Sequence, residues 1–270
     1  MQNFEDKDPI YDVAQRCPVC NYEPFVAYRL KSKTQRIILD KFLVPKYEGI
    51  RGYPDSDFSC LGVTVCPSCL YSSEKETDFI SLSQSSFTKK PNLPSLILKE
   101  DLLNDSSNRR EILKTYNIEI KSFIRPRDKK VGFVSYLLAI ECARIKIKHQ
   151  KRHSFPEAGT YLLHAAQIAE EIGMGTLADQ YRKNAITYFA KAYERSDFPG
   201  DHDEEVSYLN IVLNLYNDDK TTAFSYVKVI EDRRREMHAK GYGDTMKIDS
   251  FWNRIKDVLY EYEYGDELDD

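Results

Sequence analysis

From about residue 107 onward, the pattern of apolar and polar positions is that of amphipathic helices. In two segments the apolar residues recur with the i, i+3, i+4 and i+7 spacing that places them on one helical face. The first stripe consists of Ala158, Tyr161, Leu162, Ala165, Ala169 and Ile172, and the second of Ile248, Phe251, Trp252, Ile255, Val258, Leu259 and Tyr262. The C-terminal part of the chain is therefore predicted to be helical.

Local signals predict where some of these helices begin and end. Ser154 and Glu157 have the S-x-x-E spacing of a capping box, which would start a helix at this point. Gly173 is predicted to end that helix and Thr176 to cap the next one. Residues 173–178 also match the pattern G-x-G-x-x-A, but that pattern binds dinucleotides only after a β-strand. A nucleotide site is therefore not predicted here.

The predicted helices follow one another through short turns, as in stacked helical hairpins. Related helix starts lie roughly 41–47 residues apart, rather than the 34 residues of tetratricopeptide (TPR) repeats. We expect a TPR-like all-α domain over residues 107–264, followed by an acidic tail at 265–270. The tyrosine-rich grooves of such a domain are expected to bind another protein.

The N-terminal part shows shorter, β-prone segments. Residues 25–39 and 61–65 are β-prone, and the loop between them is rich in Gly, Pro and Asp. We expect a small zinc-ribbon-like β unit over residues 1–83 and a linker over 84–106, which is rich in Ser, Asn, Pro and Lys. The fold class is therefore predicted to be α+β. At 270 residues, the chain is long enough for two domains with separate cores.

Four of the six cysteines form two copies of the pattern CPxC. Cys17 and Cys20 form the first copy, and Cys66 and Cys69 form the second, with 45 residues between the two. Each CxxC turn places two sulfurs on one side of a tight bend, and two turns supply the four thiolates of a tetrahedral zinc site. Four sulfurs leave no position for water, so we expect one structural zinc ion per chain. Iron bound by the same sulfurs is the minor alternative.

The two remaining cysteines are not expected to be essential metal ligands. Cys60 lies six residues before Cys66 and is read as a small buried residue, although it could replace a ligand in a distorted site. Cys142 lies among apolar residues of a predicted helix, which favours core packing. A dithiol redox role is not favoured, because no thioredoxin-like βαβ pattern surrounds either pair.

Charge is distributed unevenly along a chain whose net charge is −4. Residues 121–153 hold ten Lys or Arg against two acids. Five of these cations form a candidate basic strip at the end of an apolar helix: Arg144, Lys146, Lys148, Lys151 and Arg152. A solvated helix end favoured by the helix dipole explains the strip most simply. Binding of nucleic acid or of an acidic partner is the alternative.

The overall composition is that of a soluble globular protein, with 30% charged and 41% hydrophobic residues. The apolar runs are too short to cross a bilayer. The first residues lack the basic end and apolar stretch of a signal peptide, so a cytoplasmic location with reduced thiols is expected.

Several segments resemble one known family. CPVCNY, VCPSCLYSSEKETDF and YLNIVLNLYNDDKTTAFSYVKVI, together with the helical second half, are similar to an uncharacterised bacterial family catalogued as domain-of-unknown-function family 2225. The resemblance covers most of the chain and implies a metal site at the four CPxC cysteines, but no known activity. One position departs from the family. Leu70 follows the second CPxC where the family usually has Gly, and leucine tolerates a left-handed backbone less well than Asn21 in the first copy.

No catalytic motif is recognised. The histidines form no H-E-x-x-H, and no nucleophile elbow is present. We therefore expect a non-enzymatic cytoplasmic zinc protein that acts as an adaptor, binding another protein through its helical domain. The alternative is a zinc-ribbon protein that binds nucleic acid through the basic strip within residues 121–153, which the net negative charge disfavours.

Overall fold

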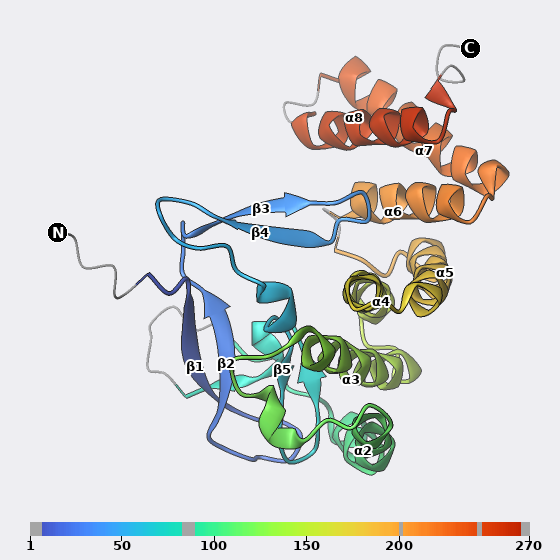
Figure 1. The fold of residues 1–270 in the computed structure, drawn as a ribbon. Coiled ribbons are helices and arrows are strands. Elements are labelled where there is room, and N and C mark those ends of the chain that lie inside the picture. The colour runs from blue at the N-terminus through green and yellow to red at the C-terminus, as the bar shows by residue number, and fades with distance from the viewer. Residues whose placement is uncertain (1–6, 83–89, 200–201, 242–244, 266–270) are drawn as a thin grey trace.

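The computed structural model describes residues 7–82, 90–199, 202–241 and 245–265 (Figure 1). Its strands all lie between residues 10 and 81, and the described chain beyond them is helical, which confirms the α+β fold. Helices α3 to α8 stack in chain order, and the sheets lie along one side of this stack (Figure 1). The type of helical repeat stays a prediction.

The N-terminal unit contains three small antiparallel sheets. In one, β1 (Ile10–Arg16) lies between β2 (Phe25–Leu30) and β7 (Ile80–Ser81). The others pair β3 (Gln35–Leu39) with β4 (Pro45–Gly49), and β5 (Thr64–Val65) with β6 (Ser72–Ser73). The first CPxC turn joins β1 to β2, and the second joins β5 to β6. Each turn therefore closes a hairpin.

The helical part follows in short steps. Its helices are α1 (Leu96–Asn104), α2 (Ser106–Thr115), α3 (Lys129–Lys148), α4 (Ser154–Glu171), α5 (Gly175–Glu194), α6 (Asp203–Tyr216), α7 (Lys220–Ala239) and α8 (Met246–Glu261). From α3 onward, each helix packs against the next one in the chain. This packing is what the predicted hairpin order requires.

The segment expected to be a linker contains a packed helix. Helix α1 lies within residues 84–106, and the Ser95 side chain caps it by accepting a hydrogen bond from the Leu98 backbone N–H. Leu98 and Leu102 are buried in the hydrophobic cluster that surrounds the CPxC cysteines. The linker prediction is therefore wrong for this helix, while the boundary at residues 83 and 84 and most of the tail at 265–270 lie outside the described residues.

One hydrophobic core extends across the predicted domain boundary. Phe42, Val44, Val63, Val65 and Leu70 from the sheet region belong to the same buried cluster as the apolar faces of α3 to α8. Burial against these side chains removes apolar helical surface from water. The sheet region and the helical part therefore share buried apolar surface, and the independence of the two predicted domains stays a prediction.

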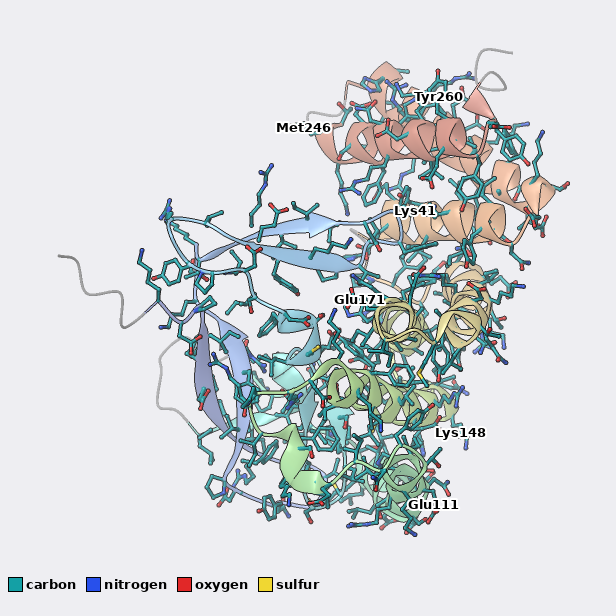
Figure 2. All side chains as sticks on the ribbon, in the orientation of Figure 1. Lys41, Glu111, Lys148, Glu171, Met246 and Tyr260 are labelled. Carbon is teal, nitrogen blue, oxygen red and sulfur yellow. The ribbon has the colours of Figure 1, made fainter. Side chains whose placement is uncertain are left out.

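The turn between β3 and β4 inserts into the helical stack. Phe42 from this turn packs edge-on against the ring of Tyr216, with 5.5 Å between ring centroids. The Tyr208 hydroxyl donates a hydrogen bond to the backbone oxygen of Lys41 at 2.9 Å, and Lys41 also forms an ion pair with Glu261 of α8. Figure 2 shows Lys41 at this junction with the helices. Two tyrosines of the array therefore bind the chain's own β3–β4 turn.

Two of the predicted helix caps are wrong. Helix α4 begins after His153, and the Asp197 carboxylate accepts hydrogen bonds from the backbone N–H groups of His153 and Phe155. Asp197 thus does what the predicted Ser154 capping box would do. Helix α5 begins at Gly175, so Thr176 lies inside it. Gly173 has a φ of 82°, as its predicted place after α4 requires.

None of the helices in the described ranges is both long enough and apolar enough to span a membrane.

Candidate metal centre

The two CPxC turns have the same backbone hydrogen bonds. The N–H of Cys17 donates to the oxygen of Tyr22, and the N–H of Asn21 donates to the oxygen of Cys17. In the second turn, the N–H of Cys66 donates to the oxygen of Tyr71, and the N–H of Leu70 donates to the oxygen of Cys66. Both bonds are 2.9 Å long. Pro18 and Pro67 follow the first cysteine of each turn, and proline pre-sets φ there.

Leu70 adopts the left-handed backbone that the motif requires, despite its side chain. Its φ is 60°, and that of Asn21 is 61°. This conformation costs a residue with a β-carbon about 1–2 kcal/mol. The Leu70 side chain is fully buried in the main core, and burying a leucine stabilises a protein by about 1.5–3 kcal/mol. Burial therefore offsets the cost of the conformation, and the second turn is as regular as the first.

The four CPxC sulfurs lie close together. The Cys17 and Cys69 sulfurs are 3.7 Å apart, those of Cys20 and Cys66 are 3.5 Å apart, and all four lie within 4.8 Å of one another. In a tetrahedral zinc site with Zn–S bonds of about 2.3 Å, neighbouring sulfurs are about 3.8 Å apart. Three of the cysteines are buried and Cys20 is half-buried. The residues present therefore fit one enclosed four-thiolate metal ion.

The clustered thiols influence one another's ionisation. The Cys66 sulfur raises the pKa of Cys17, and the Cys17 and Cys66 sulfurs together raise that of Cys69, with burial adding to both effects. Hydrogen bonds from Cys17 and Cys69 lower the pKa of Cys66 to about 2. A bound divalent cation lets all four ionise together.

The helices hold the second turn through backbone oxygens. Arg109 of α2 is fully buried, and its guanidinium donates to the Cys69 oxygen at 3.0 and 3.3 Å and to the Leu102 oxygen. It also forms an ion pair with Asp105 at 2.9 Å. The neighbouring Arg110, which is exposed, donates to the Ser68 oxygen at 2.7 Å. Helix α2 therefore holds the second turn through two of its backbone oxygens.

The other two cysteines lie apart from the four sulfurs. Within the residues that the structure describes, the metal-ligand cluster consists of the four CPxC cysteines and leaves Cys60 out. Cys60 is buried beside Gly132 of α3, and burial raises its pKa to about 12. Cys142 is buried on α3, where its sulfur accepts a hydrogen bond from the Ser72 N–H at 3.4 Å. Core packing of Cys142 and burial of Cys60 are confirmed.

The predicted basic strip is not a single surface. Lys146 is buried, and Arg144 forms an ion pair with Glu141 and donates to the Tyr188 hydroxyl. Lys148 is exposed at the end of α3 (Figure 2), beside a different cavity from the one that Lys151 and Arg152 line. Because these positions follow a helical turn and a loop, their side chains point in different directions. The continuous strip of the sequence reading is therefore wrong.

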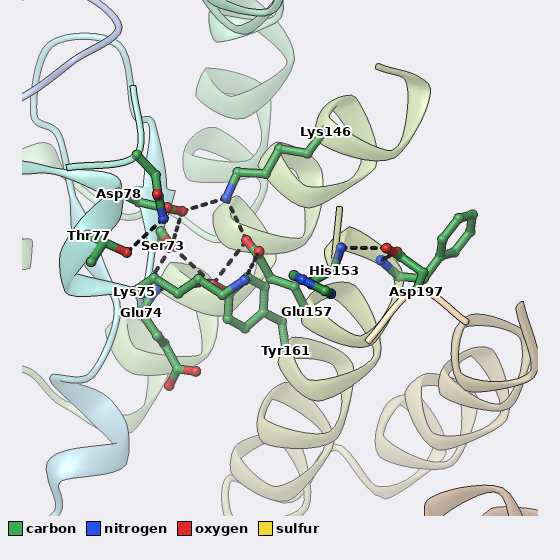
Figure 3. Close-up of polar contacts among 12 residues, drawn as sticks. Ser73, Glu74, Lys75, Thr77, Asp78, Lys146, His153, Glu157, Tyr161 and Asp197 are labelled. Atoms are coloured by element: carbon green, nitrogen blue, oxygen red, sulfur yellow. Dashed lines mark hydrogen bonds and ion pairs between the residues drawn. The ribbon is translucent and has the colours of Figure 1, made fainter. Parts of the chain in front are cut away.

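Lys146 is instead the centre of a buried ion cluster (Figure 3). Its ammonium group lies 2.7 Å from Asp78, which follows β6, and 2.6 Å from Glu157 of α4. Lys75 pairs with Glu157 at 2.5 Å, and the Ser73 hydroxyl donates to Asp78 at 2.8 Å. The cluster thus joins the strand after the second CPxC turn to α3 and α4.

The charged forms in this cluster stabilise one another. Burial alone would lower the pKa of Lys146, but Tyr71, Glu157 and Asp78 around it raise that pKa well above its usual value. Burial would likewise raise the pKa of Asp78, but Lys146 and the Ser73 hydrogen bond hold it below its usual value. Sequence reasoning missed this cluster, because it assigned Glu157 to a helix cap and Lys146 to the surface.

A family model described as "Uncharacterized protein conserved in bacteria (DUF2225)" matches residues 10–245. This range includes both CPxC turns and reaches into the helical stack as far as the start of α8. Comparisons with curated proteins and with solved structures give no match. The match covers well over half of the chain, so the protein belongs to the DUF2225 family.

Proposed function

We propose that Cys17, Cys20, Cys66 and Cys69 bind one zinc ion with a structural role, in a non-enzymatic cytoplasmic adaptor that binds another protein. The observation that carries the zinc proposal is the approach of four sulfurs within 4.8 Å on two equivalent turns. A full set of protein thiolates leaves zinc no open position for a substrate. A reducing cytoplasm keeps such thiols available for metal.

Metal analysis of the reduced, full-length protein tests the zinc proposal. We expect about one zinc per chain, and loss of that zinc in the double variant Cys17→Ser/Cys66→Ser. The variant Cys60→Ser is the matched control and keeps the metal. Iron in place of zinc would favour the minor alternative. Absence of metal from the reduced protein, or full occupancy in the double variant, contradicts the proposal.

Exposed aliphatic side chains on β3 support the adaptor role. Ile37, Ile38 and Leu39 are consecutive, and 57%, 37% and 39% of their surfaces are exposed. Within the described residues, β3 pairs with β4 along one edge, so its other edge has backbone groups free to bind. An edge strand with apolar side chains is a typical surface for adding a strand from another protein. The tyrosine-lined face is less suited to this role, because the β3–β4 turn covers part of it.

Affinity purification from native lysate, with and without nuclease, tests the adaptor role. We expect the wild type to retain a reproducible set of proteins that Ile37→Ser/Leu39→Ser loses. The control variant Leu96→Ser/Ile97→Ser changes two other exposed aliphatic residues and should retain the set. Proteins that disappear after nuclease treatment, or that both variants keep equally, contradict binding at β3.

No specific observation favours the nucleic-acid alternative. It relied on a continuous basic strip, and Lys146 of that strip is buried between two carboxylates.

A further inference from the structure

A cavity of about 290 Å³ lies directly beside the buried ion cluster. Its walls come from the segment after β6, the start of α1, the end of α3 and the loop between α3 and α4. Lys146, Asp78 and Glu157 form part of its lining. Lys151, Arg152 and His153 line it from the α3–α4 loop.

The cavity carries an excess of positive charge. Its lining includes the cations of Lys75, Lys146, Lys151 and Arg152 against the two carboxylates of Asp78 and Glu157. Lys75 and Lys146 are paired with these carboxylates. Lys151 and Arg152 are exposed and form no ion pair with any residue that the structure describes. The lining therefore has two positive charges more than it needs for neutrality.

One polar atom at the cavity also lacks a hydrogen-bond partner among the described residues. The Nδ1 atom of His153 is enclosed and has no hydrogen-bond partner among the described residues. Figure 3 shows the His153 side chain on the side of the helix start that faces Glu157. Tyr71 and Asn92 also line the cavity, and their polar side chains already pair with Asp78 and Thr77. An enclosed polar atom without a partner is uncommon, and a ligand that accepts or donates a hydrogen bond satisfies it.

We propose that this cavity binds the phosphate group of a small phosphate monoester. A phosphate dianion matches the two unpaired cations, and its oxygens accept hydrogen bonds from Lys151, Arg152 and His153. The volume lies at the lower end of the range for small-molecule sites. A nucleic-acid strand needs a row of cations along the surface, whereas Arg144 and Lys148 do not line this cavity.

Calorimetric titration of the full-length, zinc-loaded protein tests this site. The probes are inorganic phosphate, glycerol 3-phosphate and a single-stranded oligodeoxynucleotide. We expect glycerol 3-phosphate to bind with one site per chain, and Lys151→Ser/Arg152→Ser to weaken binding by about tenfold or more. The control Lys130→Ser/Lys148→Ser removes the same charge from exposed positions outside the cavity and should change the affinity by less than about twofold.

Three results overturn the proposal. The first is absence of phosphate-monoester binding by the wild type at millimolar probe concentrations. The second is an equal loss of affinity in both double variants, which indicates a general charge effect. The third is binding of the oligonucleotide alone, lost in Lys151→Ser/Arg152→Ser, which assigns these cations to nucleic acid. Thermal melting verifies that each variant is folded, and Lys151→Gln/Arg152→Gln replaces a variant that is not.

Discussion

The two CPxC turns share a backbone but not an environment. Residues 21–24, which follow the first turn, are exposed, whereas residues 70–73, which follow the second, are buried. Arg109 and Arg110 of α2 hold the second turn, and Leu70 places its side chain in the main core. The first turn is thus fixed by its cysteines and by the buried Val19, and the second also by the side chains of α2. This difference predicts that the two turns respond differently when each support is removed.

Metal removal should have the largest effect. Binding of a structural zinc ion contributes about 10–16 kcal/mol in small zinc sites, so chelation should destabilise both hairpins strongly. We expect the amides of residues 17–22 to lose hydrogen-exchange protection first, because fewer other contacts hold that turn. Residues 66–71 should keep more of their protection. Equal exchange in both turns, or faster exchange in the second, contradicts the comparison.

Loss of Lys146 should be the next largest effect. The change Lys146→Ala leaves Asp78 and Glu157 buried with reduced compensation, which should lower the free energy of unfolding by about 3–5 kcal/mol. Lys148 on the same helix is exposed, so Lys148→Ala should change the free energy of unfolding by less than about 0.5 kcal/mol. Denaturant unfolding of the zinc-loaded proteins measures both. A Lys146→Ala protein as stable as the control shows that the cluster does not support the second turn.

Arg109 and Arg110 offer a matched pair on α2. Arg109→Ala removes the donors to the Cys69 and Leu102 oxygens and the partner of Asp105, which should cost about 3 kcal/mol of stability. Arg110→Ala removes one exposed contact to Ser68 and should cost less than about 1 kcal/mol. Melting temperatures at fixed zinc rank the two variants. Equal shifts in the two melting temperatures would show that the buried guanidinium of Arg109 contributes no more to stability than the exposed one of Arg110.

The smallest effects concern the left-handed residues. Asn21→Gly keeps an easy left-handed conformation and should change stability by less than about 1 kcal/mol. Leu70→Gly relieves the backbone but deletes a fully buried side chain, so we expect a net loss of about 1–3 kcal/mol. A stabilised Leu70→Gly protein shows that backbone strain outweighs packing at this position. Urea unfolding measures both variants.

Sequence patterns predicted those structural features that depend only on residues close together in the chain. The CPxC turns were readable because each is complete within six residues, and the helices were readable because their apolar stripes repeat over several turns. The same local view failed for α1. Its polar surroundings in the sequence resemble a linker. Leu98 and Leu102 are buried only because they pack beside cysteines that lie far away in the sequence.

The errors at Lys146 and Ser154 have the same origin. Lys146 looks like its basic neighbours, because its partner Asp78 is 68 residues away. The S-x-x-E pattern suggested a cap, but Asp197 takes the free N–H groups at the start of α4, and Glu157 turns to Lys146 and Lys75. Sequence spacing alone does not show which distant group competes for a side chain. The shared core at Phe42 escaped prediction for the same reason.

The contact between the β3–β4 turn and the late helices bears on how the chain is made. Lys41 and Tyr208 are 167 residues apart, and Lys41 and Glu261 are 220 residues apart. Ribosomes add about 5–20 residues per second, so the turn waits roughly 10–40 s for these partners. During that time Phe42 lacks the ring of Tyr216 against which it packs. The nascent protein therefore carries a temporary apolar surface. Before translation ends, this surface can bind a chaperone or cause aggregation.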